Sequence, residues 1–502
     1  MKAAPAPPPI ASRAPNWHTP HRDGGFAGAG ATVRFFRFAR ALAALPLLAL
    51  AACAPDIPAQ NLALDIPPAY SEKSGGETPA LDWWKAFRQP ELSRLMARAQ
   101  KANLDIAAAI ARIEQGDAQA RLAAAPLFPV LGGSASATNS KSSAFDARVN
   151  PPARTTHQFG LNASYELDFW GKNRAAADAA DSSAVASRYD AETVRLSTQA
   201  AVANTWFAIL ASRERLRLVN ENLAVSSRVL DLINQRLAAG TATALDQAQQ
   251  QSVVANLRAN MPPFEQNIAQ NTDVLALLTG RAAPRVRAPS GRLMAASIPR
   301  VRPGLPSDLL VRRPDIAFAE ASLDASGANL AAARAAFYPS IQLTAQGGFQ
   351  SLALNTLLDP KNTFYSLAAG LTQPIFDGGK LQGNFDQIKG RQDELIANYK
   401  KSVLSGFADV EKALAAQRYQ TRLEGLQHAS LASSQRAYEL SEQRLREGTV
   451  DLVTVLNTQN TLFQVQDALV QTRLARLQAA VSLYQALGGG WPHVTVPIAI
   501  TR

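Results

Sequence analysis

The stretch HQFGLNASYELDFWGK, His157 to Lys172, alternates in hydropathy and decides the fold class. Apolar side chains occupy its odd positions from Phe159 to Phe169, and small or polar side chains occupy the even positions between them. A period of two predicts a β-strand. The surrounding sequence is rich in alanine, glutamine and leucine and predicts helices, so a role for this strand has to come from the rest of the chain.

The chain consists of two copies of one unit. LFP at Leu127–Pro129 is followed 210 residues later by FYP, and QRLAAGT at Gln235–Thr241 is followed 208 residues later by QRLREGT. The segments NLDI and LDFWGK have counterparts, RPDI and IFDGGK, at the same two offsets. Self-similarity at a near-constant offset indicates a repeat architecture. The copies cover roughly 103–280 and 313–489.

Each copy predicts a helix, two strands forming a hairpin, a long helix and a shorter returning helix. The strands are expected at about 128–140, 157–169, 338–351 and 363–376. Each long helix is expected to end near a tip glycine, Gly240 or Gly448, and to be on the order of 100 Å long. The returning helix, of about 38 residues, and the pre-strand helix, of about 23, together match this length. We therefore expect the two short helices to stack end to end beside the long one.

The only cysteine follows a segment with the pattern of a signal peptide. RFFRFAR (Arg34–Arg40) is basic, and ALAALPLLALAA (Ala41–Ala52) is apolar but too short to span a bilayer comfortably. This resembles a bacterial lipoprotein signal, which implies that Cys53 is acylated, for instance with palmitate, and becomes the mature N-terminus. Ala54 then implies delivery to the outer membrane. Residues 1–52 are thus a leader, in which 1–32 are expected to be an over-extended reading frame.

Charge and motifs exclude several function classes. The net charge is +11, but residues 1–52 hold six basic side chains and one acidic one, and the remainder has no long basic run. Nucleic-acid binding is therefore not expected. The five histidines are scattered, and no hydrolase, zinc or phosphate-loop motif is present in the sequence. We expect no enzyme, no metal and no cofactor.

The strands are expected to form a membrane barrel. Four strands leave two open edges, which hydrocarbon does not tolerate, and closing a barrel takes about eight strands or more. Several copies must therefore share one barrel. Odd positions would face lipid and even positions a wet lumen, and the expected lumen-facing residues are Gln158, Asn162, Glu166 and Asp168. A half-buried sheet in a soluble domain alternates in the same way, but the lipoprotein signal and the lack of other strands favour the barrel.

Several segments resemble one known family. These are GLPSDLLVRRPDIAFAEASL (Gly304–Leu323), LDWWKAFRQPELSRLMARAQKANLDIAAA (Leu81–Ala109), QPIFDGGK (Gln373–Lys380) and both QRLxxGT segments. They are similar to the outer-membrane factors of tripartite efflux systems, the TolC- and OprM-like channels, and in particular to the NodT-type outer-membrane lipoproteins. The resemblance covers essentially everything after Cys53.

The resemblance implies a mainly helical fold with a small transmembrane β part. Three copies would form a homotrimer with a 12-stranded β-barrel in outer-membrane lipid, continued by an α-helical tunnel through the periplasm. It would be a passive exit duct for drugs or other small molecules. Its partners would be a periplasmic adaptor (membrane fusion) protein and an inner-membrane pump of the resistance-nodulation-division class. Segment 53–102 would pack on the helical barrel, 281–312 would link the repeats, and 490–502 would be a tail.

The resemblance also assigns the tips of the long hairpins. By family, Gly240, Thr241, Gly448 and Thr449 lie where adaptors dock and the tunnel narrows; as local structure, the glycines are helix terminators. Some relatives carry aspartates six and nine residues beyond the second tip glycine. Here these positions are Thr454 and Asn457, so no acidic ring is expected there. Gate candidates also include two carboxylates, Asp246 and Asp451, which double as helix caps.

Two other functions fit parts of the sequence. One is an outer-membrane channel for type I-like protein or peptide secretion, which sequence separates poorly from efflux. The other is a lipid-anchored periplasmic coiled-coil scaffold without a pore, against which the four strands argue.

Overall fold

The computed structural model of this protein describes residues 55–57, 60–71, 79–141, 152–301, 303–304, 306–489 and 491. The chain divides into two units, Met1–Cys53 and Ala54–Arg502, and every described residue belongs to the second. The expected leader 1–52, the expected acylation site Cys53 and the expected tail 490–502, apart from Trp491, therefore lie outside the described residues.

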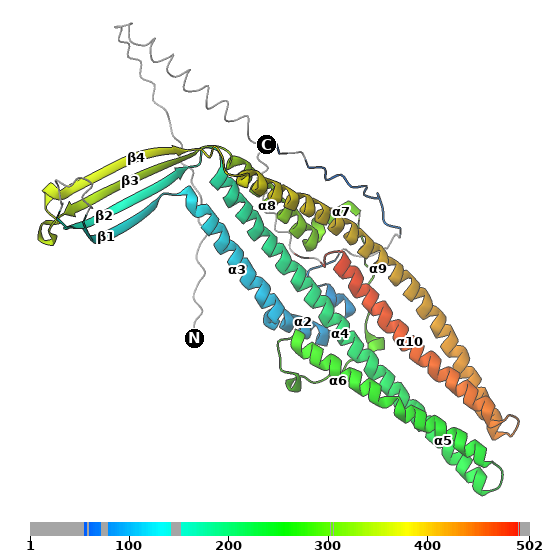
Figure 1. The fold of residues 1–502 in the computed structure, drawn as a ribbon. Coiled ribbons are helices and arrows are strands. Elements are labelled where there is room, and N and C mark those ends of the chain that lie inside the picture. The colour runs from blue at the N-terminus through cyan, green and yellow to red at the C-terminus, as the bar shows by residue number, and fades with distance from the viewer. Residues whose placement is uncertain are drawn as a thin grey trace, which may run out of the picture. The chain divides into compact units, whose positions relative to one another are not determined.

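Both copies of the repeat fold into the same series of elements. The first contains α3 (Leu104–Ala124), β1 (Val130–Ser140), β2 (Arg154–Leu167), α4 (Lys172–Ala238), α5 (Ala244–Ala259) and α6 (Met261–Leu278). The second contains α8 (Pro314–Ala335), β3 (Ser340–Ser351), β4 (Thr363–Thr372), α9 (Lys380–Arg446) and α10 (Leu452–Ala486). The long helices α4 and α9 have 67 residues each, which makes them about 100 Å long. Figure 1 shows both running from the sheet toward the same end.

Short elements lie outside the two copies. The 3₁₀ helix η2 (Trp83–Phe87) and helix α2 (Pro90–Ala102) precede the first copy. Between the copies lie two 3₁₀ turns, η4 (Ala283–Arg285) and η5 (Leu293–Ala295), followed by α7 (Pro306–Arg312). We call residues 281–301 the strap, because they cross the helices between the end of α6 and the second copy.

The strands that lead into the long helices end earlier than the alternation predicts. β2 ends at Leu167 and β4 at Thr372, whereas 169 and 376 were expected. After β4, Pro374 lacks the N–H that a strand ladder requires. After β2, the carboxylate of Asp168 accepts hydrogen bonds from the first turn of α4. The prediction that Asp168 is a strand residue is therefore wrong.

The first returning helix is broken, so the prediction of one helix of about 38 residues is wrong for this copy. α5 ends at Ala259 and α6 begins at Met261, with Asn260 between them. The break precedes Pro262 and Pro263, which lack backbone N–H groups and disfavour a helical residue before them. The second copy has no proline in this segment, and α10 runs unbroken from Leu452 to Ala486.

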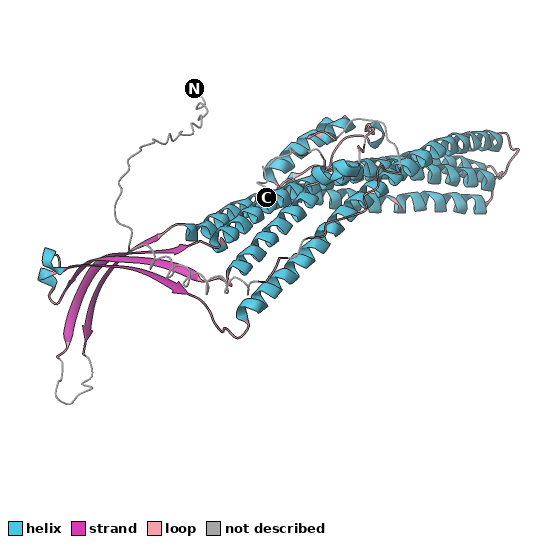
Figure 2. Cartoon of the chain, turned by 90° about the horizontal axis from the view of Figure 1, so that it is seen from above, coloured by secondary structure: helices cyan, strands magenta, loops and turns pink. Residues whose placement is uncertain are grey.

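The four strands form one antiparallel sheet in the order β1-β2-β3-β4, and Figure 2 shows the strands bent along their length. The register places odd-numbered residues opposite odd-numbered ones across all three pairs; Leu161, for example, lies between Gly133 and Gly347. One face is consequently apolar, with Leu131, Phe159, Leu161, Tyr165, Ile341, Leu343, Phe349, Tyr365, Leu367 and Leu371. The other face carries mainly serine, threonine, asparagine and glutamine.

The helices form a layer with two different edges. In the half next to the sheet, α3 packs on α4, α4 on α8 and α8 on α9. In the half toward the tips, α5 and α6 pack on α4, α4 on α10 and α10 on α9. The first copy therefore supplies one edge of the layer, α3 with α6 and α5, and the second copy supplies the other edge, α9.

The short helices meet end to end at an equivalent joint in each copy. In the first, Asn103 Nδ2 donates to the carbonyl oxygen of Leu278 at 3.0 Å. In the second, Arg313 Nη1 donates to the carbonyl oxygen of Ala486 at 3.2 Å. Each joint also contains a glycine with positive φ, Gly280 or Gly488, packed directly against the last residue of α2 or α7, just before α3 or α8 begins. The end-to-end arrangement thus follows the expected one.

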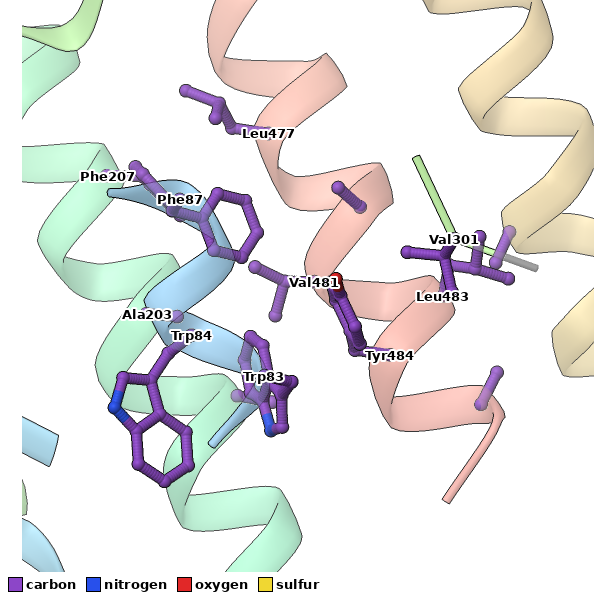
Figure 3. Packing of buried hydrophobic residues seen from close by; sticks show 14 of the residues in the cluster. Trp83, Trp84, Phe87, Ala203, Phe207, Val301, Leu477, Val481, Leu483 and Tyr484 are labelled. Atoms are coloured by element: carbon purple, nitrogen blue, oxygen red, sulfur yellow. The ribbon is translucent and has the colours of Figure 1, made fainter. Parts of the chain in front are cut away.

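The main hydrophobic core lies where η2, α2 and the strap cross the helix layer. Figure 3 shows Trp83 and Phe87 of η2 between α4 and α10. The Trp83 ring stacks on Tyr484 with centroids 5.1 Å apart, and Trp83 Nε1 donates to Gln199 Oε1 at 3.2 Å. Buried aromatic rings of this kind remove a large apolar surface from water and so stabilise the contact. It anchors η2 and its surrounding segment to the helices.

The described residues before η2, 55–57 and 60–71, contact α9 and α8. Ser71 N donates to Glu411 Oε1 at 2.8 Å, and Asp56 lies 3.4 Å from Arg334 in the last turn of α8. The described end of this segment is therefore at the sheet end of the helices. No helix within the described residues is both long and apolar enough to cross a bilayer.

Candidate functional site

The sheet has an uncovered apolar face and two unpaired edges. Tyr365 and Leu367 on this face are 84% and 75% exposed, so nothing in the described part of the chain covers them. The outer edges of β1 and β4 pair with no other strand among the described residues. In hydrocarbon, such edges must be paired by another chain. Gln158, Asn162 and Glu166 lie on the opposite, polar face of β2.

Carboxylates hold the junctions between strands and long helices. Glu166 pairs with Lys172, the first residue of α4. Asp168 accepts from the backbone N–H groups of Asn173 and Arg174 at 2.9 and 2.8 Å. In the second copy, Asp377 accepts from the N–H groups of Gly379 and Leu381. Each aspartate satisfies free donors at a helix start and complements the helix dipole.

The two tips have the same backbone geometry. Gly240 and Gly448 have φ of 74° and 76°, and the N–H of the threonine after each donates to the carbonyl of Arg236 or Arg444, at 2.8 and 2.9 Å. This is the pattern of a glycine-terminated helix, in which the left-handed residue lets the last carbonyls be satisfied. Gly240, Thr241, Gly448 and Thr449 are all exposed. Each tip is therefore a preformed, open turn.

The carboxylates beyond the tips cap the returning helices. Thr243 N donates to Asp246 Oδ2 at 2.8 Å and Asp246 N donates to Thr243 Oγ1 at 3.2 Å, a reciprocal capping box. At the second tip, Asp451 Oδ1 accepts from Thr454 N at 2.9 Å and from Thr454 Oγ1 at 2.6 Å. The Thr454 hydroxyl, and then its N–H, lower the pKa of Asp451 below its ordinary value. Asn457 is exposed one turn further on.

Both edges of the helix layer expose large apolar side chains. On α9 these are Leu404, Tyr419, Leu423, Leu426 and Leu440. On the opposite edge they are Leu104, Ile110 and Leu122 of α3, Val274 and Leu277 of α6, and Leu245 of α5. Extended apolar rows of this kind mark contacts with another protein surface.

One buried ion cluster was not singled out from the sequence. Glu424 of α9 pairs with Arg473 at 3.0 Å and with Arg476, both on α10. Burial alone would raise the pKa of Glu424, but the two guanidinium groups outweigh it and lower this pKa. Arg473 also donates to the carbonyl oxygen of Ala296 in the strap. The only sequence signal is an arginine pair three residues apart on α10, which is also common on solvated helices.

Comparison with known proteins gives one consistent result. The family model described as "Outer membrane efflux protein" matches residues 95–281 and 305–489. The pyoverdine export outer membrane protein OpmQ of Pseudomonas aeruginosa is 41% identical, over 88% of this chain and 95% of that protein. The solvent efflux pump outer membrane protein SrpC of Pseudomonas putida is 34% identical, over 81% and 86%. The crystal structure of the outer membrane protein VceC of Vibrio cholerae superposes with a TM-score of 0.78 at 26% identity, covering 82% of this chain and all of that one.

Proposed function

Since this chain belongs to the outer membrane efflux protein family, we propose that three copies of it close into one duct. The chain is the outer-membrane component of a tripartite efflux system, and such channels span the outer membrane and the periplasm. It provides a passive exit for cargo. The observation that supports closure is that sheet and helix layer have matching open edges.

The edges explain how copies would join and why three are proposed. One side of the protomer presents β1, α3, α6 and α5, and the other presents β4 and α9. Because these edges differ, the contacts would be head-to-tail, and such contacts close into a ring where the rotation between copies permits it. Two copies would give a barrel of eight strands, and side chains would fill its interior. Three copies would give twelve strands and leave an open lumen. Gln158, Asn162 and Glu166 would line that lumen, with Asp168 at its inner mouth.

The tips are the proposed contact with the rest of the system. Gly240, Thr241, Gly448 and Thr449 form open turns whose local bonds are satisfied, so a periplasmic adaptor can dock without unfolding them. An inner-membrane pump of the resistance-nodulation-division class would then supply the energy. The names of outer membrane proteins similar to this chain mention pyoverdine, solvent, toluene and antibiotic. We propose small organic molecules of this range as cargo.

At the tip, Asp246 is proposed to hold neighbouring hairpins together, with Asp451, Thr454 and Asn457 around the constriction. We expect the purified protein to be a trimer of low conductance in a planar bilayer, and Asp246→Ala to raise that conductance. The capping bonds leave some oxygen lone pairs of the Asp246 carboxylate free. Through these the carboxylate would accept a hydrogen bond from a donor on the neighbouring protomer. A monomer without conductance contradicts the duct itself.

Two controls separate the gate from the cap. Asp246→Asn keeps an acceptor for the Thr243 N–H but removes the charge, so a gate that depends on charge opens in both variants. Asp273→Ala removes an exposed carboxylate of α6 away from the tip and should leave conductance unchanged. Unchanged conductance in both Asp246 variants would assign Asp246 to capping alone.

The proposed lipid anchor at Cys53 is supported by the course of the segment that follows it. Asp56, three residues later, lies beside the last turn of α8 at the sheet end. The first described residues after Cys53 therefore lie at the end of the helices next to the sheet, as a lipid anchor in the same membrane requires. Mass spectrometry of the mature protein should show an acylated N-terminal cysteine, and Cys53→Ser should abolish the added mass. A mature chain without added mass contradicts the anchor.

A further inference from the structure

A groove of about 610 Å³ lies over α4, between α5 and α6 on one side and α10 on the other. Its lining includes two phenyl rings, Phe264 and Phe463, and seven side-chain amides, among them Asn256, Asn260, Asn457 and Asn460. The volume lies within the range of sites that take drug-sized molecules. Figure 1 shows α4 running between these helices in the half toward the tips.

The groove and the strap lie on opposite faces of α4. Arg213 Nη1 donates to the carbonyl oxygen of Pro289 in the strap at 2.6 Å. Arg215, two residues further, instead pairs with Asp467 of α10 at 2.9 Å and lines the groove. Residues two apart in a helix point about 200° apart. The added layer of strap and η2 therefore covers one face, and the groove opens on the other.

The groove consequently faces the passage in the closed duct. If the straps faced inward, three of them would fill the space that the helices of the trimer enclose. The strap therefore has to lie on the outer surface of the duct. This step rests on the proposed trimer. It places the groove within the path of cargo, in the half of the tunnel toward the tips.

The lining is neutral and has free hydrogen-bonding groups. Its two charged side chains, Arg215 and Asp467, neutralise each other, and the Arg215 guanidinium lies 4.4 Å from the centre of the Phe264 ring. Among the described residues, the side chain of a fifth lining asparagine, Asn222, donates to Gln466, whereas those of Asn256, Asn260, Asn457 and Asn460 have no hydrogen-bond partner. An amide both donates and accepts. The groove can thus satisfy a ligand's amides while its rings cover an aromatic group.

We propose that this groove is a transit site for uncharged, amide-bearing molecules with an aromatic ring, such as peptide-like compounds. Ligands with a net charge would leave their hydration without gaining an opposite charge. Passage through a duct also requires that binding be weak enough for release. The site would therefore enrich such cargo in the tunnel without trapping it.

Thiol modification tests which way the groove faces. Asn460→Cys, reacted with a cationic methanethiosulfonate reagent, should lower single-channel conductance, because the attached group narrows the passage. Ser290→Cys on the strap, also exposed, is the matched control and should react without changing the current. Reaction at position 460 with no change in current would place the groove outside the duct and overturn the proposal.

A binding measurement tests the ligand class. Dansyl-phenylalaninamide, which is neutral, should bind the purified trimer, as followed by fluorescence anisotropy. Loss of one hydrogen bond or ring contact should weaken its Kd about tenfold in Asn460→Leu and in Phe463→Ala. Asn271→Leu on α6, outside the groove, should not change it. The carboxylate analogue dansyl-phenylalanine should bind more weakly.

Two results would overturn the proposed ligand class. They are the absence of saturable binding by the unmodified trimer, and equal affinity in the lining variants. A trimer that conducts normally but shows either result leaves the duct intact and removes only the transit site. A protein that neither trimerises nor conducts would instead contradict the duct on which the site rests.

Discussion

Gly488→Ala is expected to prevent accumulation of the folded protein. An alanine Cβ at this position would lie 2.0 Å from the carbonyl oxygen of Arg312, in backbone that cannot easily move away. The φ of 84° adds the cost of a left-handed conformation, about 1–2 kcal/mol. The steric clash adds to this conformational cost. Relieving it would move the end of α10 away from the residues just before α8. We expect little folded protein in outer-membrane fractions, measured as the heat-modifiable oligomer on gels.

Three further glycines calibrate this result. Gly280→Ala breaks the equivalent joint, where Cβ would lie 2.1 Å from the carbonyl oxygen of Ala102, and should be similarly damaging. Gly448→Ala has the same left-handed strain but open space around it, so it should cost only the conformational term of about 1–2 kcal/mol. Gly425→Ala lies within α9 in open space and should be neutral or stabilising. Normal assembly of both joint variants would show that the joint does not hold the helices together.

Glu424→Ala is expected to lower the stability of the assembled protein by about 3 kcal/mol, the lower end for breaking a buried ion pair. The variant leaves Arg473 and Arg476 without their carboxylate while both remain largely buried. Arg473 also loses the orientation in which it donates to the strap at Ala296. Thermal melting followed by far-UV circular dichroism measures the effect. An unchanged melting temperature would contradict it.

The matched control and the pH dependence are both defined by the structure. Glu221→Ala removes an exposed partner of Arg217 on α4, and should change stability by less than about 1 kcal/mol.

The pKa of Glu424 is lowered in the folded protein. Its contribution is therefore fully present above the unfolded pKa, about 4.3 for glutamate, and disappears as the pH falls through the folded value. The difference between Glu424→Ala and the unmodified protein should accordingly shrink only in acid.

Local patterns account for what the sequence predicted well. Strict alternation, helical tracts without proline and paired offsets allowed the strands, both long helices and the repeat to be predicted, and the mainly helical fold class with its efflux-channel function is confirmed. The break at Asn260 was missed although Pro262 and Pro263 are visible, because the homologous segment of the second copy reads as one helix. Asp168 was predicted to face the lumen only because it occupies an even-numbered position. This alternation does not show where the strand ends and a helix cap begins.

Contacts between distant segments account for what was missed. The cluster of Glu424 with Arg473 and Arg476 joins positions 49 and 52 residues apart in sequence, and no local spacing indicates it. The groove likewise combines residues of α4, α5, α6 and α10, and its orientation depends on the strap that packs on the opposite face of α4. The close packing of Gly280 and Gly488 is visible only once the opposing backbone is placed.

The pairing of β2 with β3 has a consequence for how the protomer folds. This ladder joins residues 174 to 194 apart along the chain, from Leu167 with Ile341 to His157 with Ser351, whereas α4 with α5 and α9 with α10 are sequence neighbours. Helical hairpins form from local contacts quickly, while ladders of high sequence separation form slowly. During synthesis the β1–β2 hairpin emerges long before β3 and is marginal alone. Closure of the β2–β3 ladder is thus the slow step in forming the sheet, and until it happens the β1–β2 hairpin exposes an unpaired strand edge that is prone to aggregation, so chaperone protection is needed for that interval.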